Sequence, residues 1–346
     1  MGERTRYEQR GRGIRSENHM SMTKRRLVVG ALVLVLFALT SAELFARFSL
    51  GLGDPPLTIR DSDIDYLFAP SRCYARFGND ICYNYYSMRA TRDVEPRKTN
   101  GTELRVVVMG DSVINGGALT DDAELATRIV ERRFQSRLDR PVWVANVSAG
   151  SWGPGNLLAY VRKFGWFDAD IAILVVSSHD LADVPEFSAN LGPDFPEKTP
   201  VLALSEAVFR YLPRYLPAWP TEAGGRTSPP DRSREERGRE LFAQLLREAR
   251  SKVEKVRILH HPERDELQRE GAQGRLSRYA DLLRAEAERA GVPFVELRPY
   301  YLAATAEMQN PYRDAIHLNA TGQRRLADAL ECVVLASLGS KAETCR

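Results

Sequence analysis

Short apolar runs alternate with longer amphipathic stretches along residues 104–338 of the chain. We expect β-strands at 104–110, 142–147, 171–176, 256–259 and 292–297. The third run contains only apolar residues, which is typical of a strand buried on both faces of a parallel sheet. Helical periodicity fills the segments between the runs. This alternation predicts an α/β fold with a central parallel sheet of about five strands, joined by right-handed crossovers.

Five helices are expected within this pattern. Four of them cover residues 157–164, 234–253, 276–290 and 319–338, the last with Asn319 as its N-terminal cap. The other follows the first strand, with Asp121 and Asp122 at its start, because acidic side chains are favourable near a helix N-terminus.

Residues 182–233 interrupt the alternation. Nine prolines fall here, around one helix-like piece near 203–211. Long insertions of this kind often form lids or substrate walls at the carboxyl edge of a sheet, although a plain surface excursion is an equal alternative.

A second kind of hydrophobic pattern covers residues 27–46, which are apolar apart from Thr40, Ser41 and Glu43. Twenty helical residues span ~30 Å, about the thickness of a bilayer core. A basic tail, 1–26, precedes this run, so the positive-inside rule predicts a single-pass anchor in the cytoplasmic membrane with its N-terminus inside. Everything later would then be outside, in the periplasm of a Gram-negative cell. A signal peptide cleaved after Ala42 is the alternative, and it also exports the chain.

Composition and charge change this picture little. The formal net charge of +3 gives no reason to expect nucleic acid as a partner, and the basic tail is better explained by the apolar run that follows it. Four cysteines fit an exported protein, with local disulfides between Cys73 and Cys82 and between Cys332 and Cys345, or four free thiols as the alternative. Their spacing matches no zinc or redox motif. Residues 47–102 are expected to form a linker and cap before a catalytic domain at 103–346.

Two polar stretches at opposite ends of the α/β pattern carry candidate chemistry. Gly110-Asp111-Ser112 directly follows the first strand, at the edge where open α/β sheets place their ligands. Asp314 and His317 stand in a loop ahead of the last helix. A serine hydroxyl needs a base within hydrogen-bond reach, and that base needs an orienting acceptor. We therefore predict a hydrolytic site with Ser112 as nucleophile, His317 as base and Asp314 as orienting group.

These two motifs resemble the first and last blocks of the SGNH (GDSL-type) hydrolases, over roughly residues 104–338. The resemblance implies a flavodoxin-like three-layer sandwich and chemistry on esters or acyl groups. It also implies an oxyanion hole formed by the backbone N–H groups of Ser112 and Gly150, with Ser151 and then Gly153 as alternatives to Gly150. His179 stands where the family has asparagine, and its imidazole N–H would be the remaining donor.

The resulting hypothesis is a serine esterase or acyltransferase that forms an acyl-enzyme outside the cytoplasm. Its substrate would be an acylated small molecule or glycan, with acetyl esters of an envelope or exported polysaccharide favoured. No cofactor or metal is expected, because the pair His260 and His261 has no third ligand and suits a structural or substrate-wall role. No particular oligomeric state is predicted. The alternative, favoured by His179, is an inactive or weakly active relative that binds glycans or assists assembly.

Overall fold

A five-stranded parallel sheet forms the centre of the molecule. The computed structural model describes residues 22–187, 191–192, 194–214, 232–268 and 275–339. The strands are β5 (Leu104–Gly110), β6 (Val142–Ser148), β7 (Ile171–Ser177), β8 (Lys255–His261) and β9 (Phe294–Glu296). They pair in parallel in the order β6-β5-β7-β8-β9. This flavodoxin-like order confirms the predicted fold class and places the point where the strand order reverses between β5 and β7.

Helices cover both faces of the sheet and give it three layers. One face packs against α4 (Pro154–Phe164), α6 (Arg232–Lys252) and α8 (Arg275–Ala290). The other packs against α3 (Ala126–Arg137), α9 (Arg298–Ala306) and α10 (Ala320–Ser337). Every residue of β5, β6 and β7 is buried, which is why these strands lack the polar–apolar alternation of a half-exposed sheet.

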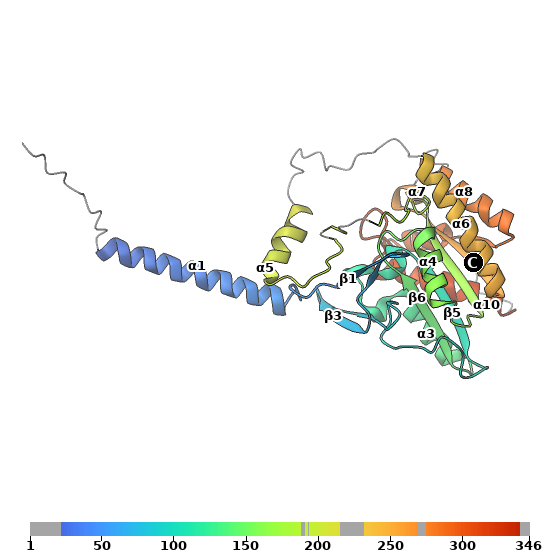
Figure 1. Cartoon of the computed structure of the whole chain (residues 1–346), viewed down its shortest axis with the longest axis horizontal. Coiled ribbons are helices and arrows are strands. Elements are labelled where there is room, and N and C mark those ends of the chain that lie inside the picture. Colours follow the sequence, from blue (N-terminus) through green and yellow to red (C-terminus); the bar gives the residue numbers. More distant parts are fainter. Residues whose placement is uncertain (1–21, 188–190, 193, 215–231, 269–274, 340–346) are drawn as a thin grey trace, which may run out of the picture.

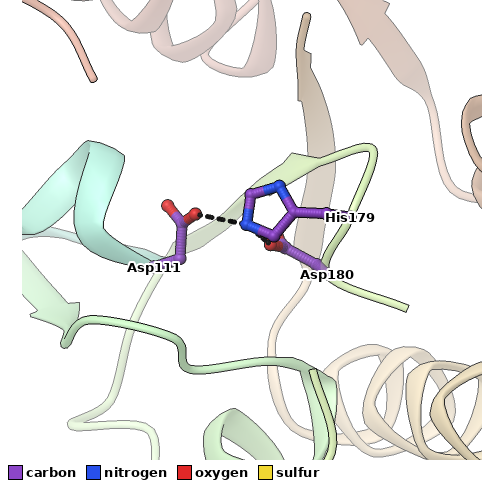
Figure 2. Close-up of side chains that lie close together, drawn as sticks. All are labelled: Asp111, His179 and Asp180. Atoms are coloured by element: carbon purple, nitrogen blue, oxygen red, sulfur yellow. Dashed lines mark ion pairs between the residues drawn. The ribbon is translucent and has the colours of Figure 1, made fainter. Parts of the chain in front are cut away.

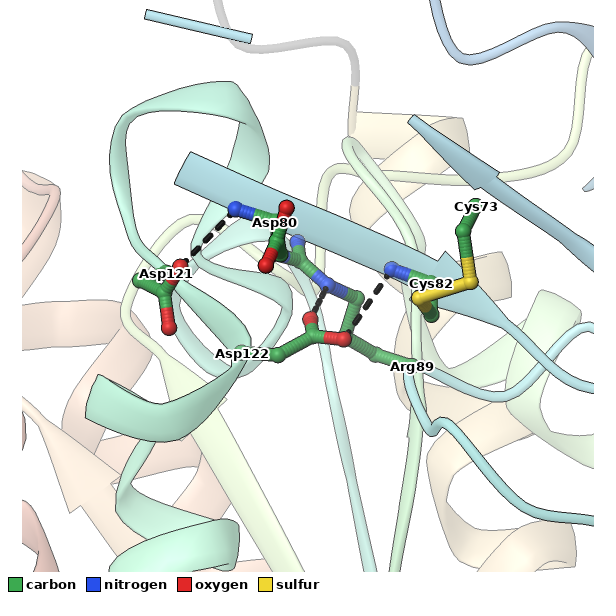
Figure 3. Close-up of a disulfide and its surroundings, with 6 residues drawn as sticks. All are labelled: Cys73, Asp80, Cys82, Arg89, Asp121 and Asp122. Atoms are coloured by element: carbon green, nitrogen blue, oxygen red, sulfur yellow. Dashed lines mark hydrogen bonds and ion pairs between the residues drawn. A yellow bond between two sulfur atoms is a disulfide. The ribbon is translucent and has the colours of Figure 1, made fainter. Parts of the chain in front are cut away.

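The predicted helix after β5 begins later than expected. A short helix α2 (Ser112–Asn115) and two 3₁₀ turns, η1 (Gly117–Leu119) and η2 (Asp122–Glu124), come first, and α3 starts at Ala126. Asp122 does not serve the α3 N-terminus because buried Arg89 holds it, with Nε 2.6 Å from its carboxylate (Figure 3). The same carboxylate accepts the backbone N–H of Cys82 at 3.0 Å. Asp121 does cap the start of the helical segment, since its carboxylate accepts the Ala123 backbone N–H at 2.8 Å at the start of η2, whereas Asp122 is paired with the buried guanidinium.

Residues 47–102 contain two short hairpins. β1 (Thr58–Asp61) pairs with β2 (Asp65–Phe68), and β3 (Arg72–Arg76) pairs with β4 (Asn79–Tyr83). Cys73 and Cys82 lie directly opposite each other in the second hairpin and form a disulfide, as predicted. Cys345, the expected partner of Cys332, lies outside the described residues.

Helix α1 (Met22–Phe48) is 27 residues long and apolar enough to cross a membrane. Figure 1 shows it projecting from the α/β body, with its last turns beside α5 (Ala203–Glu206), in the part of the insertion predicted to be helical. The Glu43 carboxylate near the end of α1 accepts the backbone N–H groups of Ala203 at 2.8 Å and Leu204 at 2.9 Å. The apolar helix is thus joined to the insertion by side-chain contacts. Residues 1–21 of the predicted basic tail and 215–231 of the insertion lie outside the described residues.

Candidate active site

The turn after β5 presents a serine at the reversal point of the sheet. Gly110 ends the strand where a Cβ would come within 2.7 Å of the Val175 carbonyl oxygen, so only glycine fits there. Asp111 caps α2, accepting the backbone N–H of Val113 at 2.8 Å. Ser112 is then the first helical residue, with its hydroxyl at the carboxyl edge of the sheet. Gly110 and Asp111 therefore have local structural reasons, and Ser112 contributes the hydroxyl.

The structure brings the three predicted catalytic side chains together. His317 Nε2 lies 3.0 Å from Ser112 Oγ, although 205 residues separate them. His317 Nδ1 lies 2.7 Å from Asp314 Oδ2. With the proton of the neutral ring on Nδ1, donated to Asp314, Nε2 is free to accept the serine hydroxyl proton. This is the geometry that an activated serine requires.

Asp314 is held as a carboxylate by its own loop. Burial alone would raise its pKa, but the backbone N–H groups of Ile316 and His317 and the imidazole of His317 lower the pKa below its ordinary value. Those N–H groups lie 3.0 Å and 2.7 Å from Asp314 Oδ1. The charged form that orients the imidazole is therefore favoured across the neutral range.

Two residues that the sequence analysis did not assign to the site hold this loop against the sheet. His261, fully buried at the end of β8, donates from Nε2 to the Ile316 carbonyl at 2.9 Å, and its Nδ1 accepts the Tyr301 hydroxyl at 3.0 Å. Arg313 donates to the Gly116 carbonyl at 3.2 Å, just beyond α2. The loop that carries His317 is thus attached both to β8 and to the segment that carries Ser112. The interpretation of His261 as structural agrees with this burial.

The candidate oxyanion donors follow β6. In the described part of the chain, the backbone N–H groups of Gly150 and Ser151 form no hydrogen bond, so either is available. The Gly153 N–H is already donated to Asn156 Oδ1 at 3.0 Å. A Cβ at Gly153 would meet the Asp183 carbonyl at 1.9 Å, so packing explains this glycine.

Tyr66, from β2, contacts the same loop and was missed by the sequence analysis. Its hydroxyl donates to the Gly150 carbonyl at 2.5 Å and so fixes the peptide that follows Gly150. In the sequence, Tyr66 stands in a stretch without clear periodicity and far from every motif, so nothing in the sequence connects it to Gly150.

His179 lies after β7 among four carboxylates. Its Nε2 faces Asp111, Asp180 and Asp183, and its Nδ1 faces Glu263 (Figure 2 draws the first two). Burial alone would lower its pKa, but the interaction with Glu263 and the neighbouring charges raise it to about 10. For the Asp183 carboxyl, burial acts in the opposite direction and raises the pKa to about 6. Both ring nitrogens are thus directed at carboxylates, and the oxyanion role of His179 stays a prediction.

A second arrangement of serine, histidine and acid is buried at the carboxyl ends of β7 and β8. Ser178 Oγ is 2.8 Å from His260 Nε2, and His260 Nδ1 is 2.7 Å from Glu296. Ser178 is fully buried, and its hydroxyl also donates to Glu266 at 2.8 Å. A serine without access to substrate cannot act as a nucleophile, so this network is structural, and the interpretation of His260 as structural agrees with it.

A flavodoxin-like parallel sheet that carries serine, histidine and aspartate at its carboxyl edge is an arrangement used by hydrolases. The sequence matches the GDSL-like Lipase/Acylhydrolase family over residues 108–325, and the chain belongs to this family. The protein is therefore a hydrolase that acts on ester bonds.

Solved structures similar to this chain include an alpha/beta hydrolase and an acetylxylan esterase. LAE5, an alpha/beta hydrolase enzyme from the metagenome of Lake Arreo, Spain, has 18% sequence identity and a TM-score of 0.42, with 68% of this chain and 95% of that chain covered. Axe2, an acetylxylan esterase from Geobacillus stearothermophilus, has 12% identity and a TM-score of 0.42, with coverage of 70% and 96%. A search of curated proteins finds no match.

Proposed function

We propose that the protein is a membrane-anchored serine esterase or acyltransferase that acts outside the cytoplasm on acyl esters. Acetyl esters are the favoured class. The observation that carries the proposal is the hydrogen-bonded triad, in which His317 lies 3.0 Å from Ser112 Oγ and 2.7 Å from Asp314. Acylated glycans of the envelope or an exported polysaccharide are the favoured substrates, with small acylated molecules as the alternative.

In the proposed mechanism, His317 Nε2 takes the hydroxyl proton as Ser112 Oγ attacks the ester carbonyl. The resulting oxyanion is stabilised by the backbone N–H groups of Ser112 and of Gly150 or Ser151, with His179 as the further predicted donor. The tetrahedral intermediate collapses, the alcohol leaves with the proton from His317, and Ser112 carries the acyl group. Water then releases it as an acid, or a sugar hydroxyl accepts it, so one triad serves both outcomes.

Export is supported by two independent features. Helix α1 is long and apolar enough to span a bilayer, and basic Lys24, Arg25 and Arg26 stand at its N-terminal end, the side expected to remain in the cytoplasm. The Cys73–Cys82 disulfide suits an oxidising compartment.

The test is hydrolysis of p-nitrophenyl acetate by the full-length chain in detergent. We expect Ser112→Ala to lower kcat/KM by at least about a thousandfold, because the nucleophile is removed. Ser178→Ala is the matched control, since it removes a second serine that contacts a histidine, and its kcat/KM should stay within a few-fold of wild type. Equal rates for wild type and Ser112→Ala, with both proteins folded by circular dichroism, would favour the glycan-binding alternative.

The acceptor needs a separate measurement. Acetylated polysaccharides should release acetate in the presence of the wild-type protein and not of Ser112→Ala. An acyltransferase would instead move the acetyl group to an added sugar, and the yield of acetylated sugar would rise with sugar concentration as free acetate falls. Turnover of p-nitrophenyl acetate without reaction of any glycan would favour a small-molecule substrate.

A further inference from the structure

The carboxylates around His179 form a cluster that the proposed mechanism does not use. Asp111 ends the β5 turn, and His179, Asp180 and Asp183 belong to the loop after β7, so the cluster joins the two segments at the reversal point of the sheet (Figure 2). We propose that His179 Nε2 and the carboxylates of Asp111, Asp180 and Asp183 bind one divalent transition-metal cation of the Zn²⁺ class. This inference does not depend on the triad.

The distances within the cluster match a coordination shell better than a set of hydrogen bonds. His179 Nε2 lies 3.6 Å from Asp111 Oδ2, 3.5 Å from Asp180 Oδ1 and 3.7 Å from Asp183 Oδ2. A charged N–H donor normally approaches a carboxylate to ~2.8 Å. Two ligands that share a tetrahedral zinc ion at ~2.1 Å are instead ~3.4 Å apart. The separations observed here need to shorten by only a few tenths of an ångström.

The other ring nitrogen of His179 has the partner that a metal-bound histidine needs. Nδ1 lies 3.4 Å from Glu263 Oε1, at the end of the β8 segment. Histidines that bind metal usually direct their second N–H to a carboxylate, which fixes the tautomer and makes the coordinating nitrogen more basic. Once this contact shortens to a hydrogen bond, Glu263 would hold the Nδ1–H and leave Nε2 as the coordinating atom.

An orphan oxygen points into the same place. Asp180 is 3% exposed, and its Oδ2 accepts the Ser177 backbone N–H at 2.8 Å. Its Oδ1 is buried and accepts no hydrogen bond in the described part of the chain, although it faces His179 Nε2. A buried carboxylate oxygen without a partner is costly, and a cation at this position would satisfy it.

The donor set selects the class of ion. One imidazole nitrogen with carboxylate oxygens suits Zn²⁺ or Mn²⁺ better than Ca²⁺ or Mg²⁺, which prefer oxygen alone. A route for entry exists, because the side chains of His179 and Asp183 are 30% and 28% exposed. Metal on Nε2 would also remove the N–H through which His179 is predicted to donate to an oxyanion, so the two roles exclude each other.

The test is equilibrium binding of Zn²⁺ to the full-length protein in detergent, by isothermal titration calorimetry after removal of bound metal with a chelator. We expect one high-affinity site per chain and a rise in Tm with added Zn²⁺. Asp180→Asn and His179→Ala should each weaken this site by at least about tenfold. Glu186→Gln is the matched control: it also removes one negative charge from this loop, but Glu186 pairs with Arg234 and does not face Nε2, so its binding should equal wild type.

Asp183→Asn provides a second variant, less buried than Asp180, in case Asp180→Asn fails to fold. Co²⁺ adds a spectroscopic readout, since a four-coordinate site gives visible absorption that His179→Ala should abolish. The absence of a stoichiometric site for both Zn²⁺ and Mn²⁺ would overturn the proposal. So would a site whose affinity is the same in wild type, His179→Ala and the folded aspartate variants. The esterase function is tested separately, because the effect of Ser112→Ala on ester hydrolysis does not change the expected binding of Zn²⁺.

Discussion

Asp314 is the most solvent-accessible member of the triad, with a side chain 49% exposed against 32% for His317. Its influence on His317 depends on one hydrogen bond at 2.7 Å and on the negative charge that its loop stabilises. Solvent screening weakens the charge but does not change the direction of the hydrogen bond, which keeps the proton of the ring on Nδ1. Orientation of the imidazole is therefore the main effect expected of Asp314.

Replacing Asp314 by asparagine tests this view. The amide can donate to Nδ1 and so favours the tautomer with its proton on Nε2, which cannot accept the Ser112 proton. We expect kcat for p-nitrophenyl acetate to fall at least about a hundredfold, with KM little changed. Asp281→Asn, an exposed substitution in α8, is the control. A wild-type kcat in Asp314→Asn would show that His317 needs no orienting carboxylate.

His261 gives a prediction about pH and stability. Burial lowers its pKa from 6.5 to about 3, although the hydrogen bond to Ile316 opposes the shift. Between these values the unfolded chain binds the additional proton, so the free energy of unfolding should fall as the pH falls from about 6.5 toward 3, by at most ~1.4 kcal/mol per pH unit. Above pH 6.5 the contribution is complete.

Urea unfolding of wild type and His261→Gln at several pH values between 4 and 7 measures this effect. The variant should be less stable at pH 7, because the contacts with Ile316 and Tyr301 are changed, yet its stability should depend less steeply on pH by about one proton. Parallel curves for the two proteins would mean that His261 does not remain neutral in the folded state.

For individual residues, the sequence predicted those that stand in short motifs. It missed those whose position near the site depends on how distant segments pack. Ser112, His317 and Asp314 stand in short patterns whose chemistry can be recognised, and the fold brings them together. Asp183 and Glu263 belong to no local motif, because Asp183 lies in the loop after β7 and Glu263 in the segment after β8. Their approach to His179 depends on how these loops pack, and no spacing along the chain encodes it.

Among the elements, the central strands were the most predictable and the N-terminal hairpins the least. Strands β5, β6 and β7 are buried on both faces, so each gives a mainly apolar run, and the predicted bounds lie within one residue of the observed ones. Strands β1 to β4 have only four or five residues, too few alternations to define a period. The long-range contacts of these hairpins, such as that between the Cys82 backbone N–H and Asp122, also leave no local signal.

The β3 hairpin and α5 are joined by a buried ion pair. Arg76 and Glu206 have side chains 0% and 4% exposed, and Arg76 Nη1 lies 3.1 Å from the Glu206 carboxylate. Glu206 also accepts the Gly53 backbone N–H at 2.7 Å. Three segments that are distant in sequence therefore meet at one carboxylate.

Removing the cation from this pair should be costly. Arg76→Met leaves the buried Glu206 with Arg210, 3.3 Å away, as its remaining cation, and we expect a loss of about 3 kcal/mol in the free energy of unfolding, measured with urea. The double variant Arg76→Met/Glu206→Gln should recover part of that loss, because it also removes the buried negative charge. A single variant as stable as wild type would show that water or another cation reaches Glu206.

For the whole molecule, the two explanations of α1 predict different mature chains. An uncleaved anchor leaves the protein in the membrane fraction after a carbonate wash, with its N-terminus intact by mass spectrometry. Cleavage after Ala42 would leave Glu43 as the first residue. We expect the intact chain, because the long basic tail before α1 favours an uncleaved anchor. A mature mass that begins at Glu43 would contradict the anchor and leave the export proposal standing.

The contact between Glu43 and the first residues of α5 has a consequence for reach. A catalytic unit on a loose tether can sample a deep layer of space above a lipid surface. Here the end of α1 is hydrogen-bonded to the backbone of Ala203 and Leu204 in the insertion, so Ser112 would stay at a nearly constant height above the bilayer if α1 spans it as proposed. Esters that lie farther from the membrane would not reach Ser112, whatever their intrinsic reactivity. The distance between an ester and the membrane would then decide whether it can react, before its fit to the active site matters.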